Sequence, residues 1–335
     1  MIPLLLWVSL TILLGGCSQQ SEAGEKQTSA SYNATELLAS TVIPNKPAEV
    51  PAVMYRSTDL GKTWSPFAEG IPKDATLSGI KQAGNNIYVT TDYHGIFLST
   101  EGENNWQQLT SASLAKLDIN CIEVEGEKLV IGTLNNGILF SEDGGLTWHP
   151  AHMEGEVASI RAFITSGGKL LAGTDAGIYH SNDMGKTWSH AYGKLQVLGF
   201  TSLGQKLYAA TQNGALVNGG GLTKWKSIYE GDALHDIGND GTYIYAMTIG
   251  QQLLKTADNG ETWQNAQNGI VRPANYYTNE LIHVEGDIFS AQWIGIYHSS
   301  DHGTNWRKLS GLPDSTAFST LEATDYGILA GISIR

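Results

Sequence analysis

The sequence predicts an all-β domain, a seven-bladed β-propeller with four-stranded blades, whose last blade is closed by strands from the N- and C-terminal ends. The first observation is a set of seven tryptophans, at positions 64, 106, 148, 188, 225, 263 and 306, spaced 37 to 43 residues apart. The second is a polar eight-residue motif, the octad, that ends at each of these tryptophans. The third is 39 glycines in 335 residues, which separate short apolar runs. A period near forty with several short strands per unit is typical of a propeller.

The N-terminal segment, residues 1–16, predicts a signal peptide. Its sequence, MIPLLLWVSLTILLGG, has no charged side chain and an apolar run too short for a confident membrane span. It ends in Leu14-Gly15-Gly16-Cys17, which resembles the lipobox of bacterial lipoproteins. That resemblance implies cleavage before Cys17 and lipidation of its thiol, and the absence of Asp at position 18 resembles the class sorted to the outer membrane. An ordinary secretory signal is the alternative.

Residues 17–50 predict a flexible tether. This stretch is rich in Ser, Glu, Gln, Ala and Pro and has no sustained apolar period. About thirty flexible residues have a root-mean-square reach on the order of 30 Å, which would hold a domain near the membrane but off it. We therefore expect the propeller to occupy residues 51–335 and the chain to lie in the bacterial cell envelope, in the periplasm or at the surface.

The octad is clearest in Ser57-Thr58-Asp59-Leu60-Gly61-Lys62-Thr63-Trp64. It resembles the Asp-box, or BNR, repeat of the sialidase-like superfamily, and the resemblance covers about residues 52–335. We expect the Asp to cap backbone N–H groups, the Gly to adopt a conformation that other residues resist, and the Trp to pack within the blade. Two copies, ending at Trp106 and Trp225, are degenerate. The structural residues of the five good copies are Asp59 and Trp64, Asp143 and Trp148, Asp183 and Trp188, Asp258 and Trp263, and Asp301 and Trp306.

The second full unit shows the expected strands of one blade. Strand A covers 119–124, strand B 128–133 and strand C 138–141, and the Asp box turns strand C into strand D near Trp148. Only one strand, 52–55, precedes the first box, and only two, near 320–323 and 328–331, follow Trp306. The two ends together therefore make one complete blade, which removes exposed sheet edges.

Charge and composition exclude several functions. With 20 basic and 33 acidic side chains, the net charge of −13 repels phosphate backbones, so no nucleic-acid partner is expected. The nine histidines show no close ligand spacing. We predict no metal and no cofactor, and a monomer. Lipidation of Cys17 would leave Cys121 without an internal partner, as a small buried apolar residue.

Loops on one face of the propeller are the predicted binding surface. The A–B turns and Asp boxes should lie on one face, and the B–C turns and D–A connections on the other, where ligands of the Asp-box families meet the loops or the central funnel. Aromatic and Arg side chains dominate binding hot spots. The candidate binding residues on this face are Tyr93, His94, Asn136, Asp175, Asn213, Gln251, Arg272, Tyr276, Tyr277 and Trp293. Each also has a plain structural role as its alternative.

A sialidase activity is disfavoured by the arginines. That family needs three arginines on a carboxylate, and this chain has five. Arg335 is the last residue and Arg56 lies beside an Asp box, which leaves Arg161, Arg272 and Arg307. Xyloglucan hydrolases use two carboxylates between tandem propellers, of which only one is present here. Asp92 and Asp175 are the B–C carboxylates that could serve such chemistry.

A binding or scaffold role for a protein or peptide partner is the leading prediction. One seven-bladed Asp-box propeller behind a lipobox resembles the photosystem II assembly-factor group and its non-photosynthetic relatives, which implies protein binding without implying photosynthesis. A sortilin-like peptide site in the propeller tunnel is a variant of this role. A glycoside hydrolase or carbohydrate-binding propeller is the alternative, and no catalytic residue is assigned.

Overall fold

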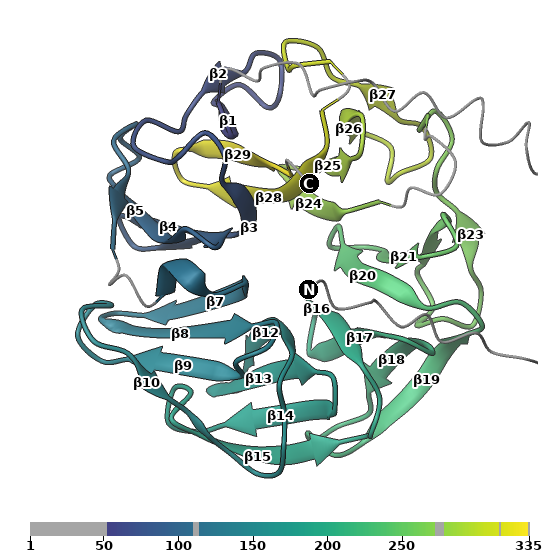
Figure 1. Cartoon of the computed structure of the whole chain (residues 1–335). Helices are drawn as coiled ribbons and strands as arrows, with labels where there is room; N and C mark the ends of the chain where they lie inside the picture. Colours follow the sequence, from purple (N-terminus) through teal and green to yellow (C-terminus); the bar gives the residue numbers. More distant parts are fainter. Residues whose placement is uncertain (1–51, 110–113, 272–277, 315, 334–335) are drawn as a thin grey trace, which may run out of the picture. The chain divides into compact units, whose positions relative to one another are not determined.

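Seven antiparallel sheets are arranged as blades around a central axis in the computed structural model (Figure 1). The structure describes residues 52–109, 114–271, 278–314 and 316–333. The predictions for residues 1–50, including Cys17, therefore lie outside the described residues. The inner strand of each blade, strand A, faces the axis, and strand D lies at the outer rim. This confirms the predicted seven-bladed β-propeller.

Blades 1 to 3 follow one another along the chain. Blade 1 is β3 (Thr76–Ala83), β4 (Asn86–Asp92), β5 (Gly95–Thr100) and β6 (Gln107–Gln108). A 3-10 helix, η1 (Leu114–Lys116), precedes blade 2, which is β7 (Ile119–Glu125), β8 (Lys128–Thr133), β9 (Ile138–Ser141) and β10 (His149–Pro150). Blade 3 is β12 (Ile160–Ser166), β13 (Lys169–Thr174), β14 (Gly177–Ser181) and β15 (Thr187–Tyr192), with β11 (His152–Met153) added in parallel at its outer edge.

Blades 4 to 6 repeat the pattern, and blade 7 joins the two ends of the domain. Blade 4 is β16 (Val197–Leu203), β17 (Lys206–Thr211), β18 (Gly214–Asn218) and β19 (Trp225–Glu230). Blade 5 is β20 (Leu234–Asn239), β21 (Ile244–Thr248), β22 (Leu253–Thr256) and β23 (Gln264–Asn265). Blade 6 is β24 (Glu280–Val284), β25 (Asp287–Gln292), β26 (Gly295–Ser299) and β27 (Arg307–Lys308). Blade 7 is β28 (Phe318–Thr324), β29 (Gly327–Ile332), β1 (Met54–Ser57) and β2 (Ser65–Pro66).

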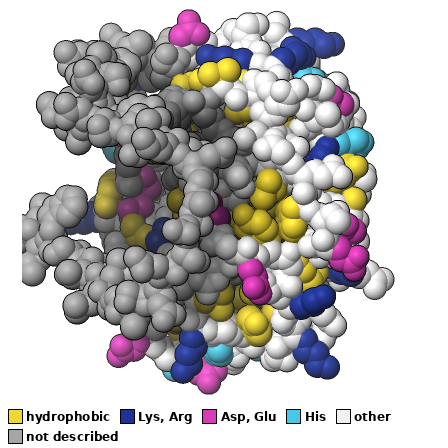
Figure 2. Space-filling view, turned by 90° about the vertical axis from the view of Figure 1, so that its right-hand side faces the viewer, with side chains coloured by type: hydrophobic (Ala, Val, Ile, Leu, Met, Phe, Trp, Pro, Cys, Tyr) yellow, Lys and Arg dark blue, Asp and Glu magenta, His cyan; other side chains and the backbone are white. Residues whose placement is uncertain are grey.

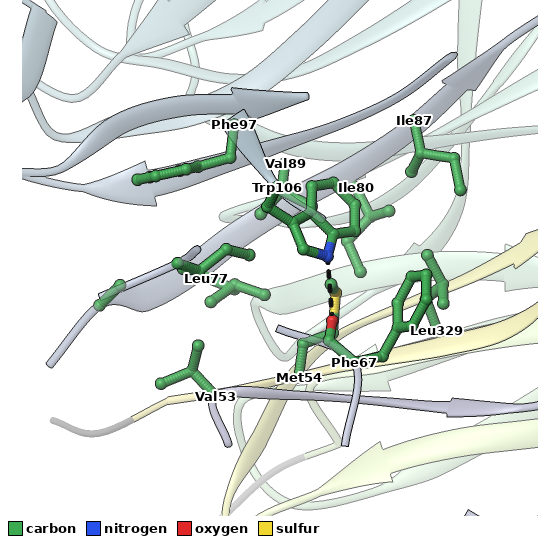
Figure 3. Close-up of a cluster of buried hydrophobic side chains, with 12 residues drawn as sticks. Val53, Met54, Phe67, Leu77, Ile80, Ile87, Val89, Phe97, Trp106 and Leu329 are labelled. Atoms are coloured by element: carbon green, nitrogen blue, oxygen red, sulfur yellow. Dashed lines mark hydrogen bonds between the residues drawn. The ribbon is translucent and has the colours of Figure 1, made fainter. Parts of the chain in front are cut away.

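The closure of blade 7 is the predicted one. The antiparallel partners of Met54 and Ser57 are Gly331 and Ile328, so β1 from the N-terminal side completes the sheet begun by β28 and β29. The strand β1 begins two residues later than the expected 52–55. Buried side chains then pack blade 7 against blade 1, among them Met54, Leu329 and Leu77 (Figure 3).

Each good Asp box is held by the same local hydrogen bonds. In the first copy, Ser57 Oγ donates to Asp59 Oδ1 at 2.8 Å and accepts from the Gly61 N–H at 2.8 Å. Asp59 also accepts from the backbone N–H of Thr63 at 2.9 Å and from its hydroxyl at 2.6 Å. The bond from the Thr63 side chain is the main cause that lowers the pKa of Asp59 to about 2. The set recurs in the boxes that begin at Ser141, Ser181, Thr256 and Ser299.

The glycine and tryptophan of the box have packing roles. Gly185 has φ +88, and a Cβ there would lie 2.5 Å from the Val130 side chain, so the box can approach the neighbouring blade only with glycine. Trp188 is 2% exposed and donates from Nε1 to the Gly185 carbonyl at 2.9 Å. In the degenerate copies other bonds replace the carboxylate: Ser99 Oγ donates to the Glu103 carbonyl at 2.6 Å.

A β-bulge recurs near the start of six of the seven inner strands. The register shifts between Leu77 and Gly79 in β3, and at the corresponding places in β7, β12, β16, β20 and β28. A bulge leaves one extra residue outside the ladder and redirects its side chain. The extra residues are Ser78, Asn120, Arg161, Leu198, His235 and Ser319, and Asn279 occupies the equivalent place just before β24.

The rim of the propeller carries mixed side chains. The view from the side of β23 shows basic, acidic and hydrophobic residues interspersed, with no single basic patch on this side (Figure 2). In the described part of the chain, no helix has the length and apolar character needed to cross a membrane.

Removal of residues 316–335 should abolish the cooperative unfolding of the domain. The deletion takes away β28 and β29, so β1 loses its partner and blades 1 and 6 each expose a buried face. The measurement is a thermal melt followed by far-ultraviolet circular dichroism. Removal of residues 334–335 alone is the control and should leave the melt unchanged. A cooperative melt with an unchanged midpoint in the longer truncation would contradict the closure argument.

Candidate binding site in the central channel

A polar cavity of about 680 Å³ lies along the axis, lined by the inner strands of all seven blades. Its size is in the range of ligand sites in proteins. Strand A of each blade enters from the D–A connection, so its first residues lie near the B–C face. The residues that line the cavity near that face include the bulge residues of the inner strands and Asp92, Asp118, Leu134 and Trp293.

Three bulge residues, together with Asn279 at the equivalent place before β24, form a chain of hydrogen bonds between neighbouring blades. Ser78 Oγ donates to the Ile119 carbonyl of blade 2, and Asn120 Nδ2 donates to the Ile160 carbonyl of blade 3 at 2.7 Å. In the same way Asn279 donates to Phe318 at 2.6 Å, and Ser319 donates to Leu77 at 2.7 Å. These bonds join blades 6, 7, 1, 2 and 3 around the channel and hold that part of the lining rigid.

Three consecutive blades depart from this pattern. The equivalent positions of blades 3, 4 and 5 are Arg161, Leu198 and His235, all of which line the cavity. Leu198 has no polar side-chain atom to offer. Burial and, second, the charge of Arg161 lower the pKa of His235 to about 4, so its imidazole is neutral at pH 7.

Carboxyl groups dominate the rest of the lining. Burial raises the pKa of Asp236 to about 7 and that of Glu280 to about 8. Glu280 Oε2 accepts from the Leu321 N–H at 2.6 Å. Farther along β28, burial and then Glu280 raise the pKa of Glu322 to about 8, and the charge of Lys81 acts in the opposite direction. Lys81 itself pairs with Glu123 at 3.1 Å.

The mouth of the channel combines acidic and aromatic side chains. Asp92 and Asp118 are buried to 8% and 7% exposure and are joined by an isolated bridge. Tyr93, which has φ 63 and is 53% exposed, places its hydroxyl 3.3 Å from Asp118 Oδ2. Trp293 is partly buried and lines the cavity from the B–C turn of blade 6.

The sequence-predicted binding residues fall into three groups. Trp293 lines the cavity, as does Asp92, and Tyr93 contacts its acidic wall. The structure places the others on their own B–C turns, outside the lining. There His94 lies 3.3 Å from Asp74, and the Asp175 carboxylate accepts from the Ser159 N–H at 3.4 Å. The remaining members of this second group are Asn136, Asn213 and Gln251, and the third group, Arg272, Tyr276 and Tyr277, lies outside the described residues.

Most of the polar residues of the inner strands were not predicted from the sequence. Asn120, His235, Asp236, Glu280 and Glu322 were not proposed as site residues, although each lies on or beside an inner strand. The signal available was polar residues within otherwise apolar strands A, once all seven strands are aligned on their Asp boxes. The bulge that turns Asn120 and His235 toward the axis is not visible in the alternation of the sequence.

Exposed apolar side chains gather on the B–C face. Among the described residues, the exposed large hydrophobic side chains are Tyr93, Leu146, Ile249 and Val271. Three of them lie on B–C turns or a D–A connection, and only Leu146 lies in an Asp box. Exposed apolar groups that cluster on one face mark interaction surfaces. No group of three or more metal-ligating side chains is found within the described part of the chain.

Comparisons with known proteins agree with this architecture. The BNR/Asp-box repeat model matches residues 55–66, and the DUF6242 beta propeller domain model matches residues 81–198. The domain is a β-propeller that carries Asp-box repeats. None of the curated proteins matches the sequence.

Several solved structures share the fold of this Asp-box propeller. YCF48 bound to D1 peptide has a TM-score of 0.60 and 16% identity, and the match covers 78% of this chain and 93% of that one. The extracellular domain of BT4673 from B. thetaiotaomicron has a TM-score of 0.65 and 15% identity, with 81% and 40% covered. The GH74 enzyme of Niastella koreensis has a TM-score of 0.58 and 17% identity, with 84% and 55% covered. At these identities the similarity concerns the fold.

Replacement of Glu322 by Gln should flatten the pH dependence of stability. The pKa of Glu322 in the folded protein, about 8, lies above the ordinary glutamate pKa of 4.5. The folded protein therefore binds this proton more tightly than the unfolded chain, and the resulting stabilisation is present below pH 4.5 and is lost as the pH rises through about 8. The free energy of unfolding is measured with urea at pH 5, 7 and 9. Between pH 5 and pH 9 it should fall on the order of 1–2 kcal/mol more in wild type than in E322Q. The exposed Glu261→Gln is the matched control, and equal slopes in wild type and E322Q would contradict the assignment.

Proposed function

We propose that this Asp-box propeller is a binding or scaffold protein that recognises a peptide segment of a protein partner at the B–C mouth of the central channel. The observation that carries the proposal is the cavity itself, which opens beside Trp293 and is lined by polar side chains whose hydrogen bonds fix its shape on one side. Ligand sites of this kind combine an aromatic surface with a few fixed polar groups.

The surface around the mouth suits an extended apolar and polar segment. Tyr93, Ile249 and Val271 are exposed apolar side chains on loops of the same face, while Asp92 and Asp118 line the cavity as buried carboxyl groups. Protein hot spots are built from such aromatic and apolar anchors beside polar groups. The similarity to YCF48, whose structure contains a D1 peptide, supports the same class of ligand.

A carbohydrate ligand is the second candidate. Burial raises the pKa of both Glu280 and Glu322 to about 8, and a protonated carboxyl group near neutral pH is what a glycosidase general acid requires. The GH74 enzyme of Niastella koreensis shares the fold, but this chain spans 55% of it. Hydrolysis of xyloglucan that disappears in Glu280→Gln would favour this candidate over the first.

Replacement of Trp293 by Ala should reduce partner capture about tenfold or more, because a large aromatic side chain at the centre of an interface contributes most of the binding energy. The experiment cross-links intact cells that carry the tagged full chain and identifies the proteins that co-purify. Leu146→Ala, which removes an exposed apolar side chain from the Asp-box face, is the matched control. Equal capture by W293A, or no discrete protein enriched by wild type, would contradict the proposed function.

We also propose that the chain is anchored in the cell envelope through a lipid on Cys17, on the basis of the lipobox-like Leu14-Gly15-Gly16-Cys17. Cys17→Ser should move the protein from the membrane to the soluble fraction and abolish incorporation of a labelled fatty acid. The control is Cys121→Ser, which should retain both properties. A C17S variant that stays in the membrane fraction with its label would overturn the anchor.

A further inference from the structure

Arg161 carries a guanidinium group that no described side chain neutralises. It is the bulge residue of β12 and lines the cavity. Its Nε is buried without a hydrogen-bond partner, and the salt bridges among the described residues do not include it. Arg56 differs, because it donates to the Gly102 carbonyl at 2.7 Å and lies 4.1 Å over the Phe67 ring.

Burial of a guanidinium group without a partner costs free energy unless an anion or a water molecule accepts its hydrogen bonds. Charged groups inside proteins are normally paired, because desolvation of a lone charge is unfavourable. The planar fork of arginine matches the two oxygens of a carboxylate, with two parallel hydrogen bonds. The donors of Arg161 therefore favour a planar anion such as a carboxylate at this place in the cavity.

The nearby groups leave this position open to a ligand. His235 is neutral at pH 7, and Leu198 between the two blades offers no polar atom. Of the cavity carboxyl groups, Glu123 pairs with Lys81 at 3.1 Å, and Asp236 lies against Gly199; no ion pair joins either of them to Arg161. Arg161 thus stands where the ring of interblade hydrogen bonds is interrupted, near the B–C end of the channel.

We infer that Arg161 binds a carboxylate of the peptide segment that enters the channel from the B–C face. The inference rests on the proposed function and deepens it, because it names the chemical group that the partner must present. A chain-terminal carboxylate and an Asp or Glu side chain share this chemistry. Either places its oxygens on the Arg161 fork while the rest of the segment extends past Trp293.

The test compares three variants of the full chain with wild type. Arg161→Gln removes the charge, Arg161→Lys keeps the charge but loses the fork, and Arg307→Gln removes an exposed charge at the outer strand β27 as the matched control. The probes are a random octapeptide library with free C-termini, its amidated twin, and an amidated library without Asp and Glu. N-acetylglycine and glucuronate are measured beside their methyl esters by isothermal titration calorimetry.

We expect peptides enriched on wild type to bind R161Q at least about tenfold more weakly, R161K to an intermediate degree, and R307Q equally well. The amidated library without acidic residues should not be enriched. If peptides bind with a free C-terminus but not in their amidated form, the bound group is the terminal carboxylate. If the amidated peptides still bind, the bound group is an Asp or Glu side chain. R161Q without ligand should melt at the same temperature as wild type or higher, because an unpaired charge is removed.

Other outcomes separate the inference from the function on which it rests. Peptides that bind R161Q as tightly as wild type overturn the inference and leave the peptide-binding function standing. Arg161-dependent binding of glucuronate without any peptide enrichment retains the carboxylate site and overturns the peptide partner in favour of an acidic glycan. A lower melting temperature of R161Q with unchanged binding shows a structural role, and binding of no probe overturns both proposals.

Discussion

The pairing of β1 with β29 is the constraint on which the rest of the structure depends. Seven blades enclose a channel only if the last blade is bonded to the first, and here that bond joins residues 54–57 to residues 328–331. The buried cluster around Met54, Leu77 and Trp106 then fills the seam between blades 7 and 1, where Trp106 Nε1 also donates to the Phe67 carbonyl at 3.1 Å (Figure 3). Because the ring is closed, each inner strand has a fixed neighbour on both sides, and an interblade hydrogen bond can form.

The recurrent bulge turns this closed ring into a site. A regular strand alternates its side chains between its two neighbours, so every residue of an inner strand would pack between blades. The extra residue in six inner strands breaks that alternation and directs one side chain per blade toward the axis. Where that residue is Ser or Asn, it donates a hydrogen bond to the next blade, whereas Leu198 has no polar side-chain atom and the buried Nε of Arg161 has no hydrogen-bond partner. The same bulge therefore joins neighbouring blades on one side of the channel and places the Arg161 side chain at the cavity on the other side.

The fold could be predicted from the sequence because its decisive interactions are local. The bonds of Asp59 reach only from Ser57 to Thr63, so one octad contains the whole turn and its repetition counts the blades. The site could be predicted only in part, because its residues meet across blades. Trp293 was found through its place in a turn, yet Asp175, chosen for the same reason, caps Ser159 within its own blade. Arg161 was considered only as a sialidase arginine, since no local pattern shows that it occupies a bulge.

The carboxyl groups with shifted pKa values fall into two sets, those in the Asp boxes and those buried on the inner strands. Hydrogen bonds within the boxes, first of all from the threonine side chain, lower the pKa of Asp59, Asp143 and Asp258 to about 2, so these groups favour the folded state when ionised. Burial raises the pKa of Glu280 and Glu322 to about 8, so these groups oppose folding when ionised. Buried carboxyl groups with a raised pKa cost stability when they ionise. Such groups are typical of binding or catalytic sites. The ionised box carboxylates therefore stabilise the Asp-box face, whereas Glu280 and Arg161 with its buried Nε, which both line the cavity, are groups whose charge opposes folding.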